Sequence, residues 1–221
     1  LAFLAMFILA FFFAKDIYNI LLIPYTQVAG PEARLIYTAP QEYFIVQIKV
    51  AFFFAIFCAF PVIATQIYRF VAPGLYRNEK RLALPLLVAA VLLFYVGIAF
   101  AYFVLLPAMF AFLTATVPEG VTMMPDINAY LSFVLVMGLA AGLAFEMPIA
   151  VLVALMLGWV TPAQLSEWRG YVIVVIAILA ALLTPPDGLS MVLLMIPMWL
   201  LYEAGLLVGR LLVRAKPTEA V

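Results

Sequence analysis

Long apolar stretches that recur along the chain constrain its fold more than any other feature of the sequence. Of the 221 residues, 69% are hydrophobic and only 10% are charged, whereas about a quarter of the residues of a soluble domain are charged. So few charged side chains cannot cover the surface of a water-soluble protein of this size, and the apolar surface must therefore face lipid. The sequence predicts an all-α, polytopic membrane protein.

The apolar stretches are separated by polar, charged or proline-rich connectors, and they predict a six-transmembrane-helix bundle that forms a single membrane domain over residues 1–221. The expected helices span approximately residues 1–14, 45–69, 82–106, 130–159, 171–183 and 189–207, and a cytoplasmic tail covers residues 208–221. At 1.5 Å per residue the first would be about 21 Å long, too short for a hydrocarbon core of about 30 Å. We interpret it as a truncated transmembrane helix rather than a signal peptide or a short buried helix, because neither a basic leading segment nor a cleavage site is visible.

The expected fifth helix is also short. At about 20 Å it must thin the bilayer or be sheltered by its neighbours. A thin wall suits a protein that perturbs the membrane, but a tight hairpin at the Pro185–Pro186 pair would look the same.

Basic residues are distributed unequally between the two sets of connectors. One side carries eight and the other carries three, namely Lys15, Arg34 and Lys49. Because cytoplasmic connectors carry an excess of Lys and Arg, we expect both chain ends to lie inside (N-in/C-in) in the cytoplasmic (inner) membrane. The first outer connector, residues 15–44, mixes apolar with polar residues and predicts short interfacial helices.

Several classes of function are disfavoured by residues that the chain lacks. It has no histidine and one cysteine, and it has no G-x-x-x-x-G-K-[ST] motif. Histidine-based catalysis, Cys/His metal sites and nucleotide hydrolysis by a P-loop are therefore not expected. The net charge of zero gives no indication of nucleic-acid binding. We predict no enzyme activity, no cofactor and no metal.

Glu146 is the most informative single residue, because it lies near the middle of the expected fourth helix. A carboxylate at that depth costs about 2.5–3.5 kcal/mol and usually faces protein or trapped water. Gly138 and Gly142 share its stripe of the helix and form a small-residue contact motif, so this stripe should face another helix or a cavity. Pro148 should leave the carbonyl of Ala144 without its helical donor and kink the helix. Glu146 is either a functional acid or a protonated side chain bonded to a neighbouring helix.

Two further acidic residues have more ordinary interpretations. Glu203 lies nearer the inner end of the sixth helix, where we expect an interfacial or interhelical contact. Asp187 follows the Pro185–Pro186 pair and is well placed to cap the sixth helix.

The inner connector after the second helix runs Phe70-Val-Ala-Pro-Gly-Leu75-Tyr76-Arg77-Asn-Glu79-Lys-Arg81 and has one carboxylate among several cations. It serves either as a positively charged membrane anchor, with Glu79 paired to a neighbouring cation, or as a binding site for a cationic ligand. The second interpretation requires a group such as a guanidinium, which a carboxylate can bind through two hydrogen bonds.

These segments resemble the signatures of the C subunit of the twin-arginine protein translocase, the TatC family. The resemblance extends over nearly the whole chain and rests on residues 70–81 and on Pro61, Asp126-Ile-x-x-Tyr130-Leu-Ser-Phe133, Phe145-Glu146-x-Pro148, Leu183-Thr184-Pro185-Pro186-Asp187 and Ile196-Pro197-Met198.

The resemblance implies a receptor for folded cargo that binds twin-arginine signal peptides at its cytoplasmic face. It implies partners of the single-span TatA and TatB type, an oligomeric complex in contact with membrane lipids, and dependence on the protonmotive force. It implies a signal-peptide site at Phe70, Leu75, Tyr76, Arg77 and Glu79, a functional buried acid at Glu146, and a docking face for TatA/TatB that contains Thr184, Asp187 and Glu203.

Two departures from the family pattern affect these expectations. The family's N-terminal His-Leu-x-Glu-Leu-Arg-like motif has no counterpart in this sequence, so we expect only part of the arginine site here. Met191 stands where relatives often have a polar residue. Two other hypotheses remain open, which are a proton-coupled small-solute transporter that uses Glu146 and a passive assembly scaffold.

Overall fold

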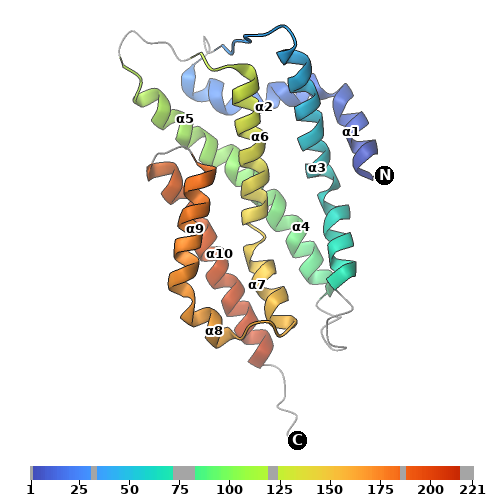
Figure 1. Ribbon diagram of the computed structural model, residues 1–221, viewed down its shortest axis with the longest axis vertical. Helices are drawn as coiled ribbons and strands as arrows, with labels where there is room; N and C mark the ends of the chain where they lie inside the picture. Colours follow the sequence, from blue (N-terminus) through green and yellow to red (C-terminus); the bar gives the residue numbers. More distant parts are fainter. Residues whose placement is uncertain (1, 31–33, 72–82, 119–123, 185–187, 215–221) are drawn as a thin grey trace, which may run out of the picture. The chain divides into compact units, whose positions relative to one another are not determined.

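The computed structural model describes residues 2–30, 34–71, 83–118, 124–184 and 188–214. Within these ranges the secondary structure is helical, and the only β-type pairing is an isolated bridge between Ile36 and Asp126 (Figure 1). The prediction of an all-α protein is confirmed.

The helices follow the predicted apolar stretches closely. Their bounds are α1 (Ala2–Phe12), α2 (Ala14–Ala29), α3 (Glu42–Val71), α4 (Ala83–Phe100), the π-helical turn η3 (Ala101–Leu105), α5 (Leu106–Ala115), α6 (Ile127–Ala144), α7 (Met147–Met156), α8 (Pro162–Glu167), α9 (Arg169–Leu183) and α10 (Gly188–Arg214).

Four helical segments within the described ranges are long and apolar enough to cross a membrane, and they cover residues 42–70, 84–115, 127–156 and 188–211. The pair α1–α2 is a fifth candidate, although its two helices are bent by 78°, and α9 is apolar but has only 15 residues. Each of the six predicted stretches therefore corresponds to a helix or helix pair.

The third predicted helix, residues 82–106, is longer than expected, because its segment continues past residue 106 to Ala115. The π-helical turn η3 joins α4 to α5, and Pro107 lies in the first turn of α5. Proline has no amide hydrogen to donate, so the helix must rearrange its hydrogen bonds here. The backbone N–H of Leu106 accordingly donates to the carbonyl of Ala101, five residues back.

The chain divides into two compact units. The first contains residues 1–63 and 97–141, and the second contains residues 64–96 and 142–221. The expectation of one membrane domain stays a prediction.

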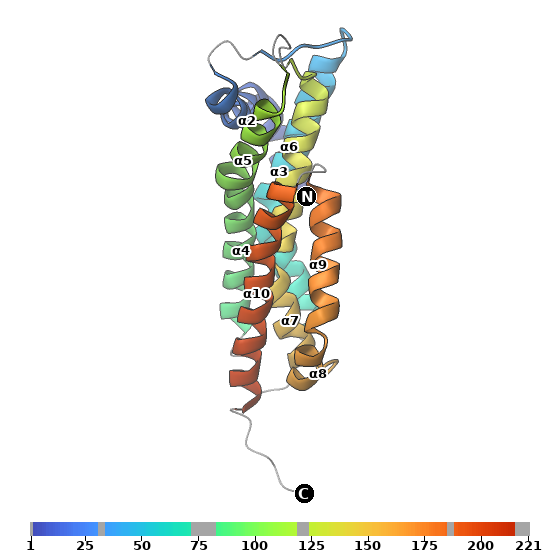
Figure 2. The ribbon, with the colours of Figure 1, turned by 90° about the vertical axis from the view of Figure 1, so that its left-hand side faces the viewer.

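In the first unit, α2 runs crosswise near the end where α3 and α6 begin (Figures 1 and 2). The hydroxyls of Tyr130 and Tyr102 donate hydrogen bonds to two carbonyls of α2, at 2.8 and 2.6 Å. The fully buried Tyr25 of α2 packs its ring against Phe110 and Tyr130. This helix lies within the connector for which interfacial helices were predicted.

In the second unit, α10 packs along α7 and also contacts α8 and α9. The core of this unit is a cluster of buried side chains from α7, α8 and α10, namely Val151, Leu155, Leu165, Tyr202 and Leu206. Gly205 lets α10 approach α7 closely, because a Cβ atom at this position would lie 2.9 Å from the Cα of Pro148.

Candidate functional site

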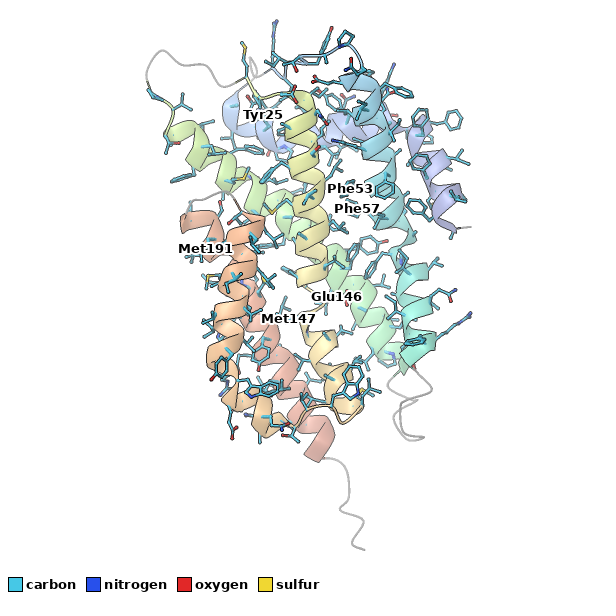
Figure 3. The ribbon with its side chains drawn as sticks, viewed as in Figure 1. Tyr25, Phe53, Phe57, Glu146, Met147 and Met191 are labelled. Atoms are coloured by element: carbon cyan, nitrogen blue, oxygen red, sulfur yellow. The ribbon has the colours of Figure 1, made fainter. Side chains whose placement is uncertain are left out.

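The fourth predicted helix is broken at Glu146 (Figure 3). The helix α6 ends at Ala144 and α7 begins at Met147, with Pro148 in its first turn. Because proline cannot donate to the carbonyl of Ala144, the regular hydrogen-bond pattern stops, and the backbone N–H of Glu146 donates instead to the carbonyl of Leu143 at 3.1 Å. The predicted loss of the helical hydrogen bond at Pro148 is confirmed as a break between α6 and α7.

The side chain of Glu146 is partly buried. Its Oε1 atom is buried and accepts no hydrogen bond from any of the residues that the structure describes. A buried carboxylate oxygen without a donor is costly inside a membrane span. The break therefore presents an acceptor that can take a hydrogen bond from an incoming donor or hold a proton.

Glycines allow close packing between helices within each of the two units. Within the first unit, a Cβ atom at the buried Gly138 would lie 3.6 Å from the ring of Phe57 on α3. Within the second unit, Gly205 of α10 contacts Pro148, two residues after Glu146. The glycine that begins the predicted stripe thus faces protein.

Glu203 forms an interhelical ion pair. The Arg169 Nε and Nη2 atoms, from the start of α9, donate to the two carboxylate oxygens of Glu203 at 2.6 and 2.7 Å. The neighbouring Tyr202 hydroxyl donates to the carbonyl of Leu165 at 2.6 Å. These bonds hold the base of α9, together with α8, against α10, which agrees with the interhelical contact expected for Glu203.

Thr184 is buried at the other end of α9, with 6% of its surface exposed. Its hydroxyl donates to the carbonyl of Ala180 at 2.8 Å, and its backbone N–H donates to the same carbonyl at 2.9 Å. Both bonds complete the last turn of α9. Asp187 lies outside the described residues, and Met191 is partly buried on α10 (Figure 3).

A shallow groove of ≈ 260 Å³ lies between α9 and α10. Its lining is entirely apolar and consists of Ile173, Ile176, Val192, Met195, Ile196, Trp199 and Leu200. Both helices also carry exposed apolar side chains outside the groove, such as Leu182 on α9 and Leu211 on α10. The two helices therefore present a surface suited to lipid or to another apolar helix.

Phe70 lies at the end of α3 and is 86% exposed. Leu75, Tyr76, Arg77 and Glu79, which were predicted to act with it, lie outside the described residues. Their grouping into one site stays a prediction.

Two features of the described residues were not predicted from the sequence. Arg169 is the partner of Glu203, and Lys49 of α3 bonds to Asn128 and Ser132 of α6. A lysine within an apolar helix is itself a signal, because such residues are rare in membrane spans. Within the described ranges, no group of three or more Cys, Asp or Glu residues is placed to hold a metal.

Comparisons with known proteins identify similar chains. A family model described as "Sec-independent protein translocase protein (TatC)" matches residues 1–197. The Sec-independent protein translocase protein TatC of Azotobacter chroococcum mcd 1 is 45% identical over 208 residues, which cover 94% of this chain and 82% of that protein. The protein with the same description from Escherichia coli (strain K12) is 41% identical over 210 residues, which cover 95% of this chain and 81% of that protein.

The fold is also similar to solved structures. A crystal structure described as the twin arginine translocase receptor TatC has a TM-score of 0.82 and 39% sequence identity, and the match covers 96% of this chain and 93% of that one. A second crystal structure of such a receptor, in DDM, has a TM-score of 0.83 and 40% identity over 94% of this chain and 92% of that one.

Proposed function

The chain belongs to the TatC family of Sec-independent protein translocase proteins, and from this membership we propose that it acts as the receptor and core subunit of the twin-arginine translocase. The observation that carries this proposal is the family match over residues 1–197. It favours a translocase over the proton-coupled small-solute transporter that the acid at Glu146 alone would allow.

Export of folded cargo tests the proposal. The full-length protein is produced in a bacterium that lacks its own TatC, together with its TatA- and TatB-type partners. A folded fluorescent reporter behind a twin-arginine signal peptide should reach the periplasm, and replacement of the two arginines by lysines should abolish export. Equal export of both reporters would refute the receptor function.

We propose that the signal peptide binds at the cytoplasmic end of α3. Phe70 supports this location, because an aromatic side chain that is 86% exposed at a helix end is available to pack against an apolar ligand. In this proposal Glu79 binds an arginine guanidinium through two charge-assisted hydrogen bonds, and Leu75, Tyr76 and Arg77 complete the site.

The role of Glu79 is tested by the affinity for a twin-arginine peptide, measured by fluorescence anisotropy with the translocase in nanodiscs. The substitution Glu79→Gln should weaken binding at least about tenfold, since hydrogen bonds to charged groups contribute about 1.5–3 kcal/mol. Glu167→Gln is the matched control, because Glu167 is exposed on α8 and lies outside the proposed site. Equal affinities for the two variants would exclude Glu79 from the site.

The face formed by α9 and α10 is our proposed docking surface for the single-span partners TatA and TatB. Its apolar groove and exposed apolar side chains suit a transmembrane helix. Thr184 lies at one end of this face, and Asp187 follows it by three positions in the sequence. Because Glu203 is bonded to Arg169, its part in docking is to hold α9 in place.

Site-specific cysteine crosslinking from Val192 in this groove to the partner's transmembrane helix tests the docking surface. Crosslinking from Val192 should exceed crosslinking from Val136, which is equally well exposed on α6. Comparable yields from both positions would remove this face from the proposal.

We further propose that the protein lies in the cytoplasmic membrane with both chain ends inside, as the distribution of basic residues indicates. A reporter enzyme that is active only in the periplasm should therefore remain inactive when it is fused after the C-terminus.

We also propose that export depends on the protonmotive force and that Glu146 is the functional acid.

A further inference from the structure

Lys49 occupies an unusual position within a membrane span. It lies about 10 Å below the start of α3, at 1.5 Å per residue. Its Nζ atom donates to the Oδ1 atom of Asn128 at 2.7 Å and to the Oγ atom of Ser132 at 2.9 Å, both on α6. All three residues belong to the first compact unit. We call this group the Lys49 cluster.

The charge of Lys49 is not neutralised by any residue that the structure describes. Both of its bonded acceptors are neutral, and no ion pair within the described ranges includes it. The described carboxylates nearest to it in this unit bond elsewhere. Asp126 accepts the backbone N–H of Ala129 through Oδ1 at 2.8 Å, while its buried Oδ2 accepts no hydrogen bond from the residues that the structure describes. Glu42 accepts two hydrogen bonds from Thr38. The Lys49 cluster therefore carries a net positive charge.

The remaining hydrogen-bonding groups of the cluster are mostly donors. Because Lys49 uses Oδ1 of Asn128 as an acceptor, the amide group of Asn128 has two N–H groups left to donate. Ser132 accepts from Lys49 through its oxygen and keeps its O–H to donate, and Lys49 itself has a third N–H. Three neighbouring donor groups, one of which carries a positive charge, are the chemistry of an anion site.

The position of the cluster indicates which anion it would meet. Asn128 lies in the first turn of α6, so the ammonium group reaches towards the end of the span. On α3, the flanking residues Ile45, Ile48 and Phe52 are exposed and apolar, as expected for side chains that face lipid. The 30 residues of α3 span about 45 Å, so a hydrocarbon core of about 30 Å centred on this helix would begin about 8 Å below its start. Lys49 is therefore expected near the boundary between the hydrocarbon core and the headgroups, at the edge of a surface suited to face lipid.

We propose that the Lys49 cluster binds the phosphate of an anionic phospholipid in the leaflet where α3 and α6 begin. The lipid phosphate would neutralise Lys49 and accept hydrogen bonds from Asn128 and Ser132, and its acyl chains would lie along the apolar side chains of α3. An anionic lipid is favoured over a zwitterionic one, because the latter carries its own cation beside the phosphate.

Native mass spectrometry of the purified, delipidated protein tests this proposal by titration with phosphatidylglycerol or phosphatidylcholine. Phosphatidylglycerol should bind more tightly, and Lys49→Met should weaken its binding at least about fivefold, because a charge-assisted hydrogen bond to the phosphate is lost. Lys49→Arg should retain most of the affinity. The matched control is Lys15→Met, which removes an exposed lysine from α2 and should leave the affinity unchanged.

Ser132→Ala provides a second variant that keeps the lysine and removes one acceptor and one donor, so it tests the site even if Lys49→Met folds poorly. Unchanged phosphatidylglycerol affinity in both variants would overturn the proposal, and so would equal losses in Lys49→Met and Lys15→Met. Inorganic phosphate provides a further test. If millimolar phosphate alone displaces the lipid from the wild-type protein, the site takes free phosphate and the lipid assignment is wrong.

Discussion

Replacement of Gly205 by alanine tests how closely α10 must approach α7 beside the break at Glu146. A Cβ atom at this position would lie 2.9 Å from the Cα atom of Pro148 and 3.2 Å from its Cβ and carbonyl oxygen. Favourable contacts between carbon atoms require about 3.5–4.0 Å. Because the obstructing atoms include backbone, they cannot rotate away, and one of the two helices must shift.

The expected cost follows from two opposing effects. Overpacking of this kind costs about 1–3 kcal/mol, whereas alanine is favoured over glycine inside a helix by about 0.5–1 kcal/mol. We therefore expect Gly205→Ala to lower the free energy of unfolding by about 1–2 kcal/mol. Gly170→Ala is the matched control, because a Cβ atom at Gly170 of α9 would have nothing within 4 Å.

Thermal unfolding in detergent, followed by circular dichroism, measures the difference between the two variants. Gly205→Ala should unfold at a lower temperature than the wild-type protein, and Gly170→Ala should unfold at the same temperature or higher. The reasoning would be refuted if Gly205→Ala were at least as stable as Gly170→Ala.

Three further predictions concern side chains in the described ranges. Arg169→Ala should lower the unfolding temperature modestly, because the ion pair that it removes with Glu203 is only partly shielded from solvent (40% and 24% of the side chains exposed), and a charge-exchanged Arg169→Glu/Glu203→Arg variant should recover part of this loss in the same thermal assay. Tyr130→Phe should cost about 1 kcal/mol, since the Tyr130 hydroxyl donates to the carbonyl of Leu21 from a buried ring, and Tyr130→Leu should cost more. Glu146→Ala should impair export of a folded reporter while the protein still inserts at normal levels, and export at the wild-type rate would contradict a functional role for this acid.

Proline and apolar length made much of the fold predictable from the sequence. The break at Glu146 follows from Pro148, because the consequence of a missing backbone donor is local to the chain. The same local rule applies at Pro107, but there the helix absorbed the missing donor as a π-helical turn and continued to Ala115. Whether a proline ends, kinks or widens a helix depends on packing that the sequence alone does not express.

Side-chain partners were less predictable, because they depend on how distant segments meet. Glu203 was expected to make an interhelical contact, but its partner Arg169 precedes it by 34 positions. The bonds from Lys49 join residues 79 and 83 positions apart. The sequence indicates that a charge within an apolar helix needs a partner, and only the arrangement of helices identifies it.

The central claim is that this chain belongs to a receptor that recognises a pair of arginines. The most direct measurement is the dissociation constant of the assembled full-length translocase for a twin-arginine signal peptide and for the same peptide with two lysines. Lysine retains the charge but cannot form the paired hydrogen bonds of a guanidinium, so we predict at least about tenfold weaker binding of the twin-lysine peptide. Equal dissociation constants for the two peptides would contradict the account.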